Sequence, residues 1–231
     1  MTATLRSSLA EALGTALLVA AIVGSGLMAE RLSDDRGVML LMNVLSTVLV
    51  LALLVALLIP LSGAHLNPVV TLVSVLRKDF PPYTALTYSL AQCVGAVSGT
   101  VLAHLMFGEP LLQIATLQRS SLGTLVGEVV ATTGLIVLIG VMVAREQHRL
   151  LPVAVASWIA GASLFTSSAS FANPAVTLGR ALTDSFTGIA PSSVLPYVGT
   201  QLVGALVGLL LLALLQTPSL HKPSPQKETV R

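Results

Sequence analysis

The sequence predicts an all-α membrane protein in which six transmembrane helices and two half-helices form an inverted repeat. Three observations lead to this fold class. Of the 231 residues, 54% are hydrophobic and only 10% are charged, whereas a soluble globular domain carries about 25% charged residues. Long segments such as 38–76 and 80–108 contain no Asp, Glu, Lys or Arg, and they are longer than a soluble core helix requires. The second half of the chain also repeats motifs of the first.

Six apolar segments are expected to span the membrane when they are read against charged residues and Pro or Gly breaks. The first resembles a signal peptide, because Arg6 precedes an apolar run. We expect this segment to be retained as the first transmembrane helix and not cleaved, since Glu11 interrupts the run. The apolar part also continues to Met28, which makes it long enough to cross a bilayer. The expected spans are about 5–28, 38–59, 83–107, 122–144, 150–165 and 193–216.

Two shorter apolar segments, 67–76 and 173–182, both begin with Asn-Pro. Neither is long enough to cross a membrane alone. Asn is a preferred helix N-cap, and Pro suits the first helical position because its missing N–H would have no intrahelical partner there. Each segment is therefore expected to start a half-helix.

The chain is expected to form one transmembrane channel domain over 1–231. Six spans place both termini on one side, and the Lys and Arg count favours the cytoplasm, with eight residues on that face and four on the other. The eight are Arg6, Arg77, Lys78, Arg145, Arg149, Lys222, Lys227 and Arg231. The polar, Pro-containing tail 217–231 is expected to be disordered because it cannot bury a core.

Repeat 1 covers about 5–107 and repeat 2 about 122–216, and their motifs occur in the same order. Three spans precede the second copy, so the two copies must have opposite orientations in the membrane. Gly pairs in the third and sixth spans are expected to let these two helices pack closely. The matches are Glu11-x-x-Gly14-Thr15 with Glu128-x-x-Ala131-Thr132, Asn67-Pro68 with Asn173-Pro174, and Gln92-x-x-Gly95-x-x-x-Gly99 with Gln201-x-x-Gly204-x-x-x-Gly208.

A broken helix in each inverted repeat places two half-helix N-termini face to face near the bilayer midplane. Each carries about half a positive charge and free backbone N–H groups, so the centre repels cations and tolerates neutral solutes. Asn67 and Asn173 either only cap their helices or also offer amide donors to a passing solute. The predicted function is passive passage of small neutral solutes and water.

These motifs resemble those of the aquaporin (major intrinsic protein) family. The segment SGAHLNPVVT at 62–71 is similar to the first Asn-Pro-Ala box and FANPA at 171–175 to the second. The expected pore boxes are Asn67, Pro68, Val69, Asn173, Pro174 and Ala175. Val69 replaces the usual Ala and is expected to add bulk near the narrow centre. The resemblance implies a homotetramer with one pore per subunit, in a bacterial-type inner membrane, without catalytic activity, cofactor or metal.

Five further residues are expected to brace the loops before the boxes. Glu11 and Glu128 lie inside apolar spans, where an unpaired carboxylate is costly. In the family, the matching residues accept backbone N–H bonds; a proton-coupling role is the alternative. Gln92 and Gln201 resemble similar braces, and His65 either binds backbone groups or lines a vestibule.

The resemblance also locates a constriction on the outer side, which is expected to set selectivity. The family's offsets from the two box Asn residues give Thr47, Gly161, Ser170 and Val176. The set lacks the aromatic residues and the Arg of water-selective relatives, so we expect a wide, weakly polar filter. A filter without the Arg resembles that of bacterial aquaglyceroporin-like channels linked to arsenic handling. Arsenite, glycerol and urea are all small neutral solutes that such a filter would suit.

Arg180 follows Val176 by one turn and could either return positive charge to the outer mouth or pair with Asp184. A proton- or ion-coupled secondary transporter remains the alternative function, because such proteins also use inverted repeats and broken helices. An intramembrane enzyme is not supported, since no nucleophile elbow or His-Glu-x-x-His motif occurs. The basic residues are scattered and form no dense basic face, which excludes nucleic-acid binding. Cys93 is the only cysteine in the sequence, so an internal disulfide is excluded.

Overall fold

The computed structural model describes residues 3–215, which form eight α-helices and no strand. The predicted fold class is confirmed. Gln216 and the predicted disordered tail, 217–231, lie outside the described residues. The helices are α1 (Ala3–Leu32), α2 (Arg36–Ser62), α3 (Pro68–Leu76), α4 (Pro82–Phe107), α5 (Leu122–Ala144), α6 (Leu151–Phe165), α7 (Pro174–Arg180) and α8 (Pro191–Leu215).

The helices fall into three length classes. Within residues 3–215, α1, α2, α4, α5 and α8 are long and apolar enough to cross a membrane. The fifth predicted span, α6, has only 15 residues, which at about 1.5 Å per residue is shorter than a hydrocarbon core of about 30 Å. The half-helices α3 and α7 have 9 and 7 residues.

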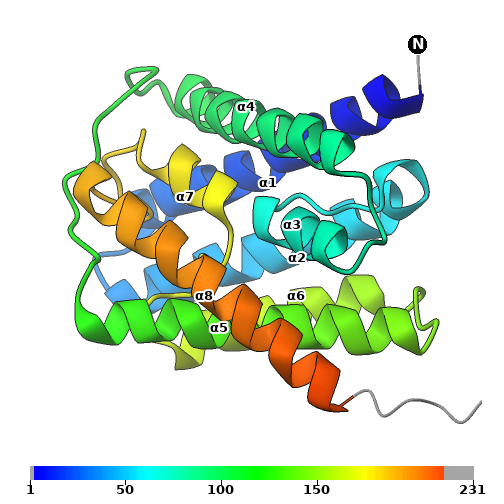
Figure 1. Ribbon diagram of the computed structural model, residues 1–231. Helices are drawn as coiled ribbons and strands as arrows, with labels where there is room; N and C mark the ends of the chain where they lie inside the picture. Colours follow the sequence, from blue (N-terminus) through cyan, green and yellow to red (C-terminus); the bar gives the residue numbers. More distant parts are fainter. Residues whose placement is uncertain (1–2, 216–231) are drawn as a thin grey trace, which may run out of the picture.

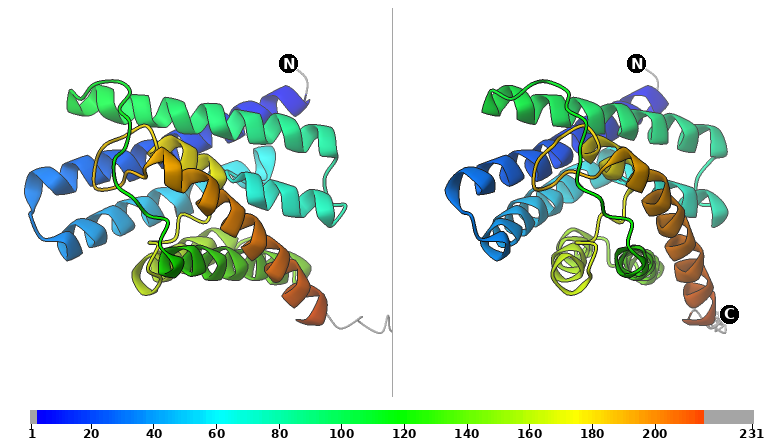
Figure 2. Two further views of the ribbon diagram at one scale, coloured as in Figure 1. Left: turned by 60° about the vertical axis from the view of Figure 1, so that its left-hand side comes forward. Right: turned by 90° about the vertical axis from the view of Figure 1, so that its left-hand side faces the viewer.

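The helices of the two halves pack in the same pattern. In the first half α1 lies against α4 and α2, and in the second half α5 lies against α8 and α6. The contact between α2 and α6 joins the halves, and α3 and α7 lie inside the bundle between them (Figures 1 and 2). The two described chain ends, at α1 and α8, lie at the same end of the bundle, on the right in Figure 1.

The Gly pairs act within each repeat, not between the third and sixth spans as the sequence suggested. A Cβ at Gly99 of α4 would lie 2.2 Å from the carbonyl oxygen of Ala16 in α1, and one at Gly204 of α8 would lie 2.7 Å from the carbonyl oxygen of Val129 in α5. Small residues thus let backbones approach closely. The spacing revealed the small face of each helix but could not reveal its partner.

Gly99→Val is therefore expected to lower stability strongly, because its side chain would force α1 and α4 apart, an overpacking cost of typically 1–3 kcal/mol or more. Gly161→Ala is the matched control, because its Cβ would meet nothing within 4 Å. The measurement is the melting temperature of the purified protein in detergent. Equal melting temperatures for the two variants would contradict this account of α1–α4 packing.

Candidate pore and its lining

Both half-helices begin at a capping Asn followed by Pro. The Asn67 side-chain oxygen accepts from the Val69 N–H at 3.0 Å, and the Asn173 oxygen accepts from the Ala175 N–H at 3.0 Å. Both Asn residues have extended backbones, and Pro68 and Pro174 are the first helical residues. The half-helix starts follow directly from the local sequence.

The same two Asn side chains connect the two half-helices. Asn67 Nδ2 donates to the Ala172 carbonyl, and Asn173 Nδ2 donates to the Leu66 carbonyl, both at 2.8 Å. A primary amide has two N–H donors, so one donor on each Asn remains available. Because both residues line the central cavity, this second donor can serve a passing solute.

The loops that lead into the boxes have an unusual backbone. In each loop, the residues three positions and one position before the Asn have a positive φ between 45° and 53°. They are Ala64 and Leu66 in the first loop, and Ser170 and Ala172 in the second. The left-handed region costs an L-residue roughly 1–2 kcal/mol. Loop residues 63–66 and 169–172 line the cavity. This conformation must be held by other parts of the structure.

Glu11 of α1 holds the first loop. One carboxylate oxygen accepts from the Ser62 hydroxyl at 2.6 Å and the His65 N–H at 3.0 Å, and the other accepts from the Leu66 N–H at 2.6 Å and the Gln92 amide at 2.7 Å. The Glu11 side chain is fully buried. Four donors compensate its burial, which an unpaired carboxylate could not tolerate.

Glu128 of α5 occupies the equivalent position at the second loop. Its carboxylate accepts from the Phe171 and Ala172 N–H groups, both at 2.9 Å, and from the Gln201 amide at 2.7 Å. Gln201 also donates to the Thr177 hydroxyl at 3.0 Å. This is the arrangement that loop-bracing residues would make, and both carboxylates are engaged as acceptors.

His65 lines the cavity, as one of the two roles considered from the sequence requires, and its ring bonds a side-chain hydroxyl and not a backbone group. Its ring Nδ1 lies 3.1 Å from the Thr71 hydroxyl, and its ring packs against Phe80 and Tyr88 with centroid distances of 5.2 and 5.6 Å. His65 therefore joins the box region to the end of the cavity that lies towards Arg77.

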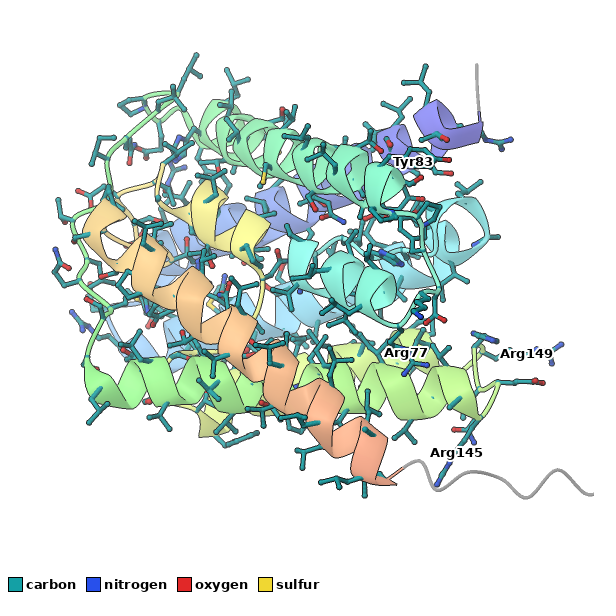
Figure 3. All side chains as sticks on the ribbon, in the orientation of Figure 1. Arg77, Tyr83, Arg145 and Arg149 are labelled. Carbon is teal, nitrogen blue, oxygen red and sulfur yellow. The ribbon has the colours of Figure 1, made fainter. Side chains whose placement is uncertain are left out.

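A continuous cavity of about 870 Å³ runs through the bundle past both boxes. Its near mouth, defined here by Arg77 and Asp79, lies at the end that holds the described chain ends, and Figure 3 shows the Arg77, Arg145 and Arg149 side chains there. Its far mouth is lined by charged residues from α1, α2, α7 and three loops. These are Glu30, Asp34, Arg36, Arg119, Arg180 and Asp184.

Between the mouths, the cavity has an apolar wall that the sequence analysis did not identify. Each helix contributes residues about four positions apart, the spacing of one helical face. Asn43 is the polar exception; its amide donates to the Ile22 carbonyl at 2.7 Å and the Ser25 hydroxyl at 2.9 Å. The wall includes Leu18 and Ile22 of α1, Leu51 and Val55 of α2, Leu135 and Ile139 of α5, and Val155 and Ile159 of α6.

Three of the four predicted filter residues line this cavity: Thr47, Ser170 and Val176. The hydroxyls of Thr47 and Ser170 are buried and have no hydrogen-bond partner among the described residues. A buried hydroxyl without a partner is costly.

Gly161 does not line the cavity, which corrects the fourth filter assignment. On α6 the lining residues near this level are Ile159 and Ser163. Gly161 lies two residues from each, a rotation of about 200° around the helix, and its surroundings are open. The cavity-facing side of α6 is the one that carries Ile159 and Ser163, and the family offset points to the other side of the helix.

Val69 also differs from its predicted role. It is 1% exposed and packs in the hydrophobic core, as does Ala175. The next residue, Val70, lines the cavity instead. The replacement of Ala by Val in the first box therefore does not narrow the pore.

Arg180 does not pair with Asp184, which was one of the two roles considered. The Asp184 carboxylate accepts from the Thr116 N–H at 2.8 Å and the Thr116 hydroxyl at 2.9 Å. Arg180 is buried and its guanidinium carbon lies 3.4 Å from the centre of the Phe171 ring. The guanidinium is therefore held on the cavity wall and not at the exposed carboxylate.

Two half-helices whose N-termini meet beside a continuous cavity, inside a bundle of membrane-spanning helices, define a multi-pass membrane channel of the inverted-repeat class. The profile of the family described as "Major intrinsic protein" matches residues 1–171. The chain belongs to this family, and it is accordingly a passive channel and not an enzyme.

Known relatives and a solved structure agree with this assignment. The chain is 42% identical over 226 residues to "Aquaglyceroporin AqpS" of Rhizobium meliloti (strain 1021), covering 96% of each protein. It is 30% identical over 223 residues to "Probable aquaporin TIP2-2" of Arabidopsis thaliana, covering 89% of this chain and 87% of that protein. The fold is similar to that of the aquaglyceroporin from Plasmodium falciparum, with a TM-score of 0.64, 22% identity, and coverage of 91% and 94%.

Proposed function

We propose that this channel conducts small neutral solutes larger than water, namely glycerol, urea and arsenite in its neutral trihydroxy form, as well as water. One observation carries the proposal: the cavity is lined at the predicted filter level by Val176, where the family's water-selective members have an Arg, and by the small residues Thr47 and Ser170. Small side chains without a fixed cation at this level favour a wide, weakly polar passage.

The lining of the cavity suits an amphipathic solute. The box loops and the two Asn residues supply a path of polar groups along the lining. Most of the remaining lining is the apolar wall from α1, α2, α5 and α6, which continues the face of α2 that carries Thr47. A polyol can bind the polar path with its hydroxyls and the apolar wall with its carbon atoms. The name of the relative AqpS, an aquaglyceroporin, supports the same solute class.

The proposed filter consists of Thr47, Ser170 and Val176, completed by Ile159 and Ser163 of α6 in place of Gly161. Arsenite is included because its three hydroxyl groups present the same donors and acceptors as a small polyol. The filter lies towards the far mouth, which is the outer mouth if both termini are cytoplasmic. The Arg77, Arg145 and Arg149 side chains at the near mouth support that orientation (Figure 3).

We further propose that the chain forms a single channel domain with one pore per subunit of a homotetramer in a bacterial-type inner membrane. The long helices expose many large apolar side chains, including Leu45, Leu49, Leu53 and Leu57 along α2. Such a face suits lipid or another subunit.

Stopped-flow measurements on proteoliposomes test the proposed solutes. We expect glycerol and urea to enter down their gradients, arsenite uptake to be detected by its total arsenic content, and water to pass as well. Passive conduction predicts that solute on the opposite side does not accelerate exchange and that uptake does not acidify the lumen. Accelerated exchange or proton movement would instead indicate a coupled transporter. If only water were conducted, the proposal of a wide filter would be wrong.

A further inference from the structure

Two guanidinium groups lie against one aromatic ring at the far mouth. The guanidinium carbons of Arg180 and Arg119 lie 3.4 and 5.4 Å from the centre of the Phe171 ring, and both residues line the cavity. Within residues 3–215, the ion pairs are Arg31–Glu109 and Arg77–Asp79. Neither Arg180 nor Arg119 forms an ion pair with a carboxylate in the described part of the chain, and the buried Glu128 carboxylate attracts both only at longer range.

Backbone carbonyls hold both groups in place without cancelling their charge. Arg180 Nε donates to the Thr187 carbonyl, and Arg119 donates to the Gly188 carbonyl at 2.7 Å and to the Phe186 carbonyl at 2.9 Å. An unpaired buried charge is costly. Three consecutive carbonyls and an aromatic face reduce that cost by hydrogen bonding and cation–π attraction.

The carboxylates and Arg36 lie at the exposed rim of the far mouth, whereas Arg180 lies deeper. The carboxylates of Glu30, Asp34 and Asp184 belong to exposed residues, whereas Arg180 is only 6% exposed. Glu30 already accepts from the Phe186 N–H at 2.7 Å, and Asp184 accepts from the Thr116 N–H and hydroxyl. A solute entering from this side passes the exposed carboxylates first and then reaches a buried cation one turn from the filter residue Val176.

We propose that Arg180, assisted by Arg119, is the charge-selective element of the far mouth. Its guanidinium repels cationic solutes and offers hydrogen-bond donors to neutral ones, two effects that Val176 cannot supply. The inference rests on the proposed function, because it explains how a filter without Arg stays selective for neutral solutes. Phe171 acts as a positioning residue, since its ring holds the guanidinium against the cavity wall.

Urea and guanidinium provide the test, because they have nearly the same planar shape and differ by one charge. Their permeabilities are measured side by side in proteoliposomes containing purified protein. Replacing Arg180 by Gln is expected to raise the guanidinium-to-urea permeability ratio roughly tenfold or more, since a unit charge in a poorly screened mouth acts over several ångströms. Arg180→Glu should raise the ratio further. Arg180→Lys should keep it near the wild-type value, because Lys retains the charge.

Arg36→Gln is the matched control, because Arg36 is exposed and lines the same mouth. Its ratio is expected to stay within about twofold of the wild type, since an exposed charge is well screened. Arg119→Gln serves as a second variant if Arg180→Gln does not fold, with an expected rise of about threefold because Arg119 is less buried.

The inference is overturned if folded Arg180→Gln, or Arg119→Gln in its place, conducts urea with an unchanged guanidinium-to-urea permeability ratio. It is also overturned if Arg180→Lys admits guanidinium as readily as Arg180→Gln does. The proposed function fails in a different way, because the wild type would then conduct no urea or glycerol. The two failures are therefore separated by the wild-type urea flux alone.

Discussion

Val176→Arg is expected to reduce glycerol, urea and arsenite permeability by roughly tenfold or more, while water permeability falls much less. Val176 is 4% exposed and lines the cavity, as does Ser170. A guanidinium there narrows the passage and adds a fixed cation one turn from Arg180. Since water is the smallest permeant, the ratio of water flux to solute flux should rise. Stopped-flow swelling with a panel of solutes measures this ratio directly.

Two control variants separate size from charge at this position. Val176→Leu adds volume without charge and is expected to reduce large-solute flux only modestly. Val176→Lys adds the charge without the planar donor array, so it should exclude solutes in a similar way but conduct water less well than the Arg variant. All variants must be compared at equal amounts of folded protein. If Val176→Arg left the permeabilities of all the solutes unchanged, the constriction would lie elsewhere.

Glu128→Leu is expected to produce little folded protein. The substitution removes the acceptor of three buried donors, namely the N–H groups of Phe171 and Ala172 and the amide of Gln201. Each buried donor left without a partner costs about 1–3 kcal/mol, and a typical protein's whole stability is only about 5–15 kcal/mol. The left-handed residues Ser170 and Ala172 would also lose their support. Yield and monodispersity after extraction in detergent measure the outcome.

Glu128→Gln is expected to be intermediate. The new amide keeps one oxygen acceptor, and the Gln201 side-chain oxygen, which has no partner among the described residues, can accept its N–H if the Gln201 amide flips. Its flux should be insensitive to pH, as in the wild type, because the carboxylate only braces the loop. If Glu128→Gln folds but abolishes flux, and the wild type acidifies the lumen during uptake, the coupled-transporter interpretation would be correct.

Much of the architecture could be predicted because its signals are local or repeated. The half-helices begin where Asn67-Pro68 and Asn173-Pro174 predict, since an N-cap and a first-turn Pro act within a few residues. The apolar spans follow from length and composition. Glu11 and Glu128 were recognised as residues that need partners, because a carboxylate inside an apolar span is costly in any fold.

The direction in which a side chain faces was decided only by the tertiary structure. Gly161 and Val69 were expected at the pore, but Ile159 with Ser163 and Val70 line it instead. A shift of one or two residues turns a side chain by about 100° or 200° around a helix, and the rotation of each helix is set by its packing neighbours. The sequence alone determined that a broken-helix channel would form around Asn67 and Asn173. Only the folded chain decided where the Arg180 guanidinium lies, because its partners, Phe171 and the Thr187 carbonyl, depend on how two loops close over α7.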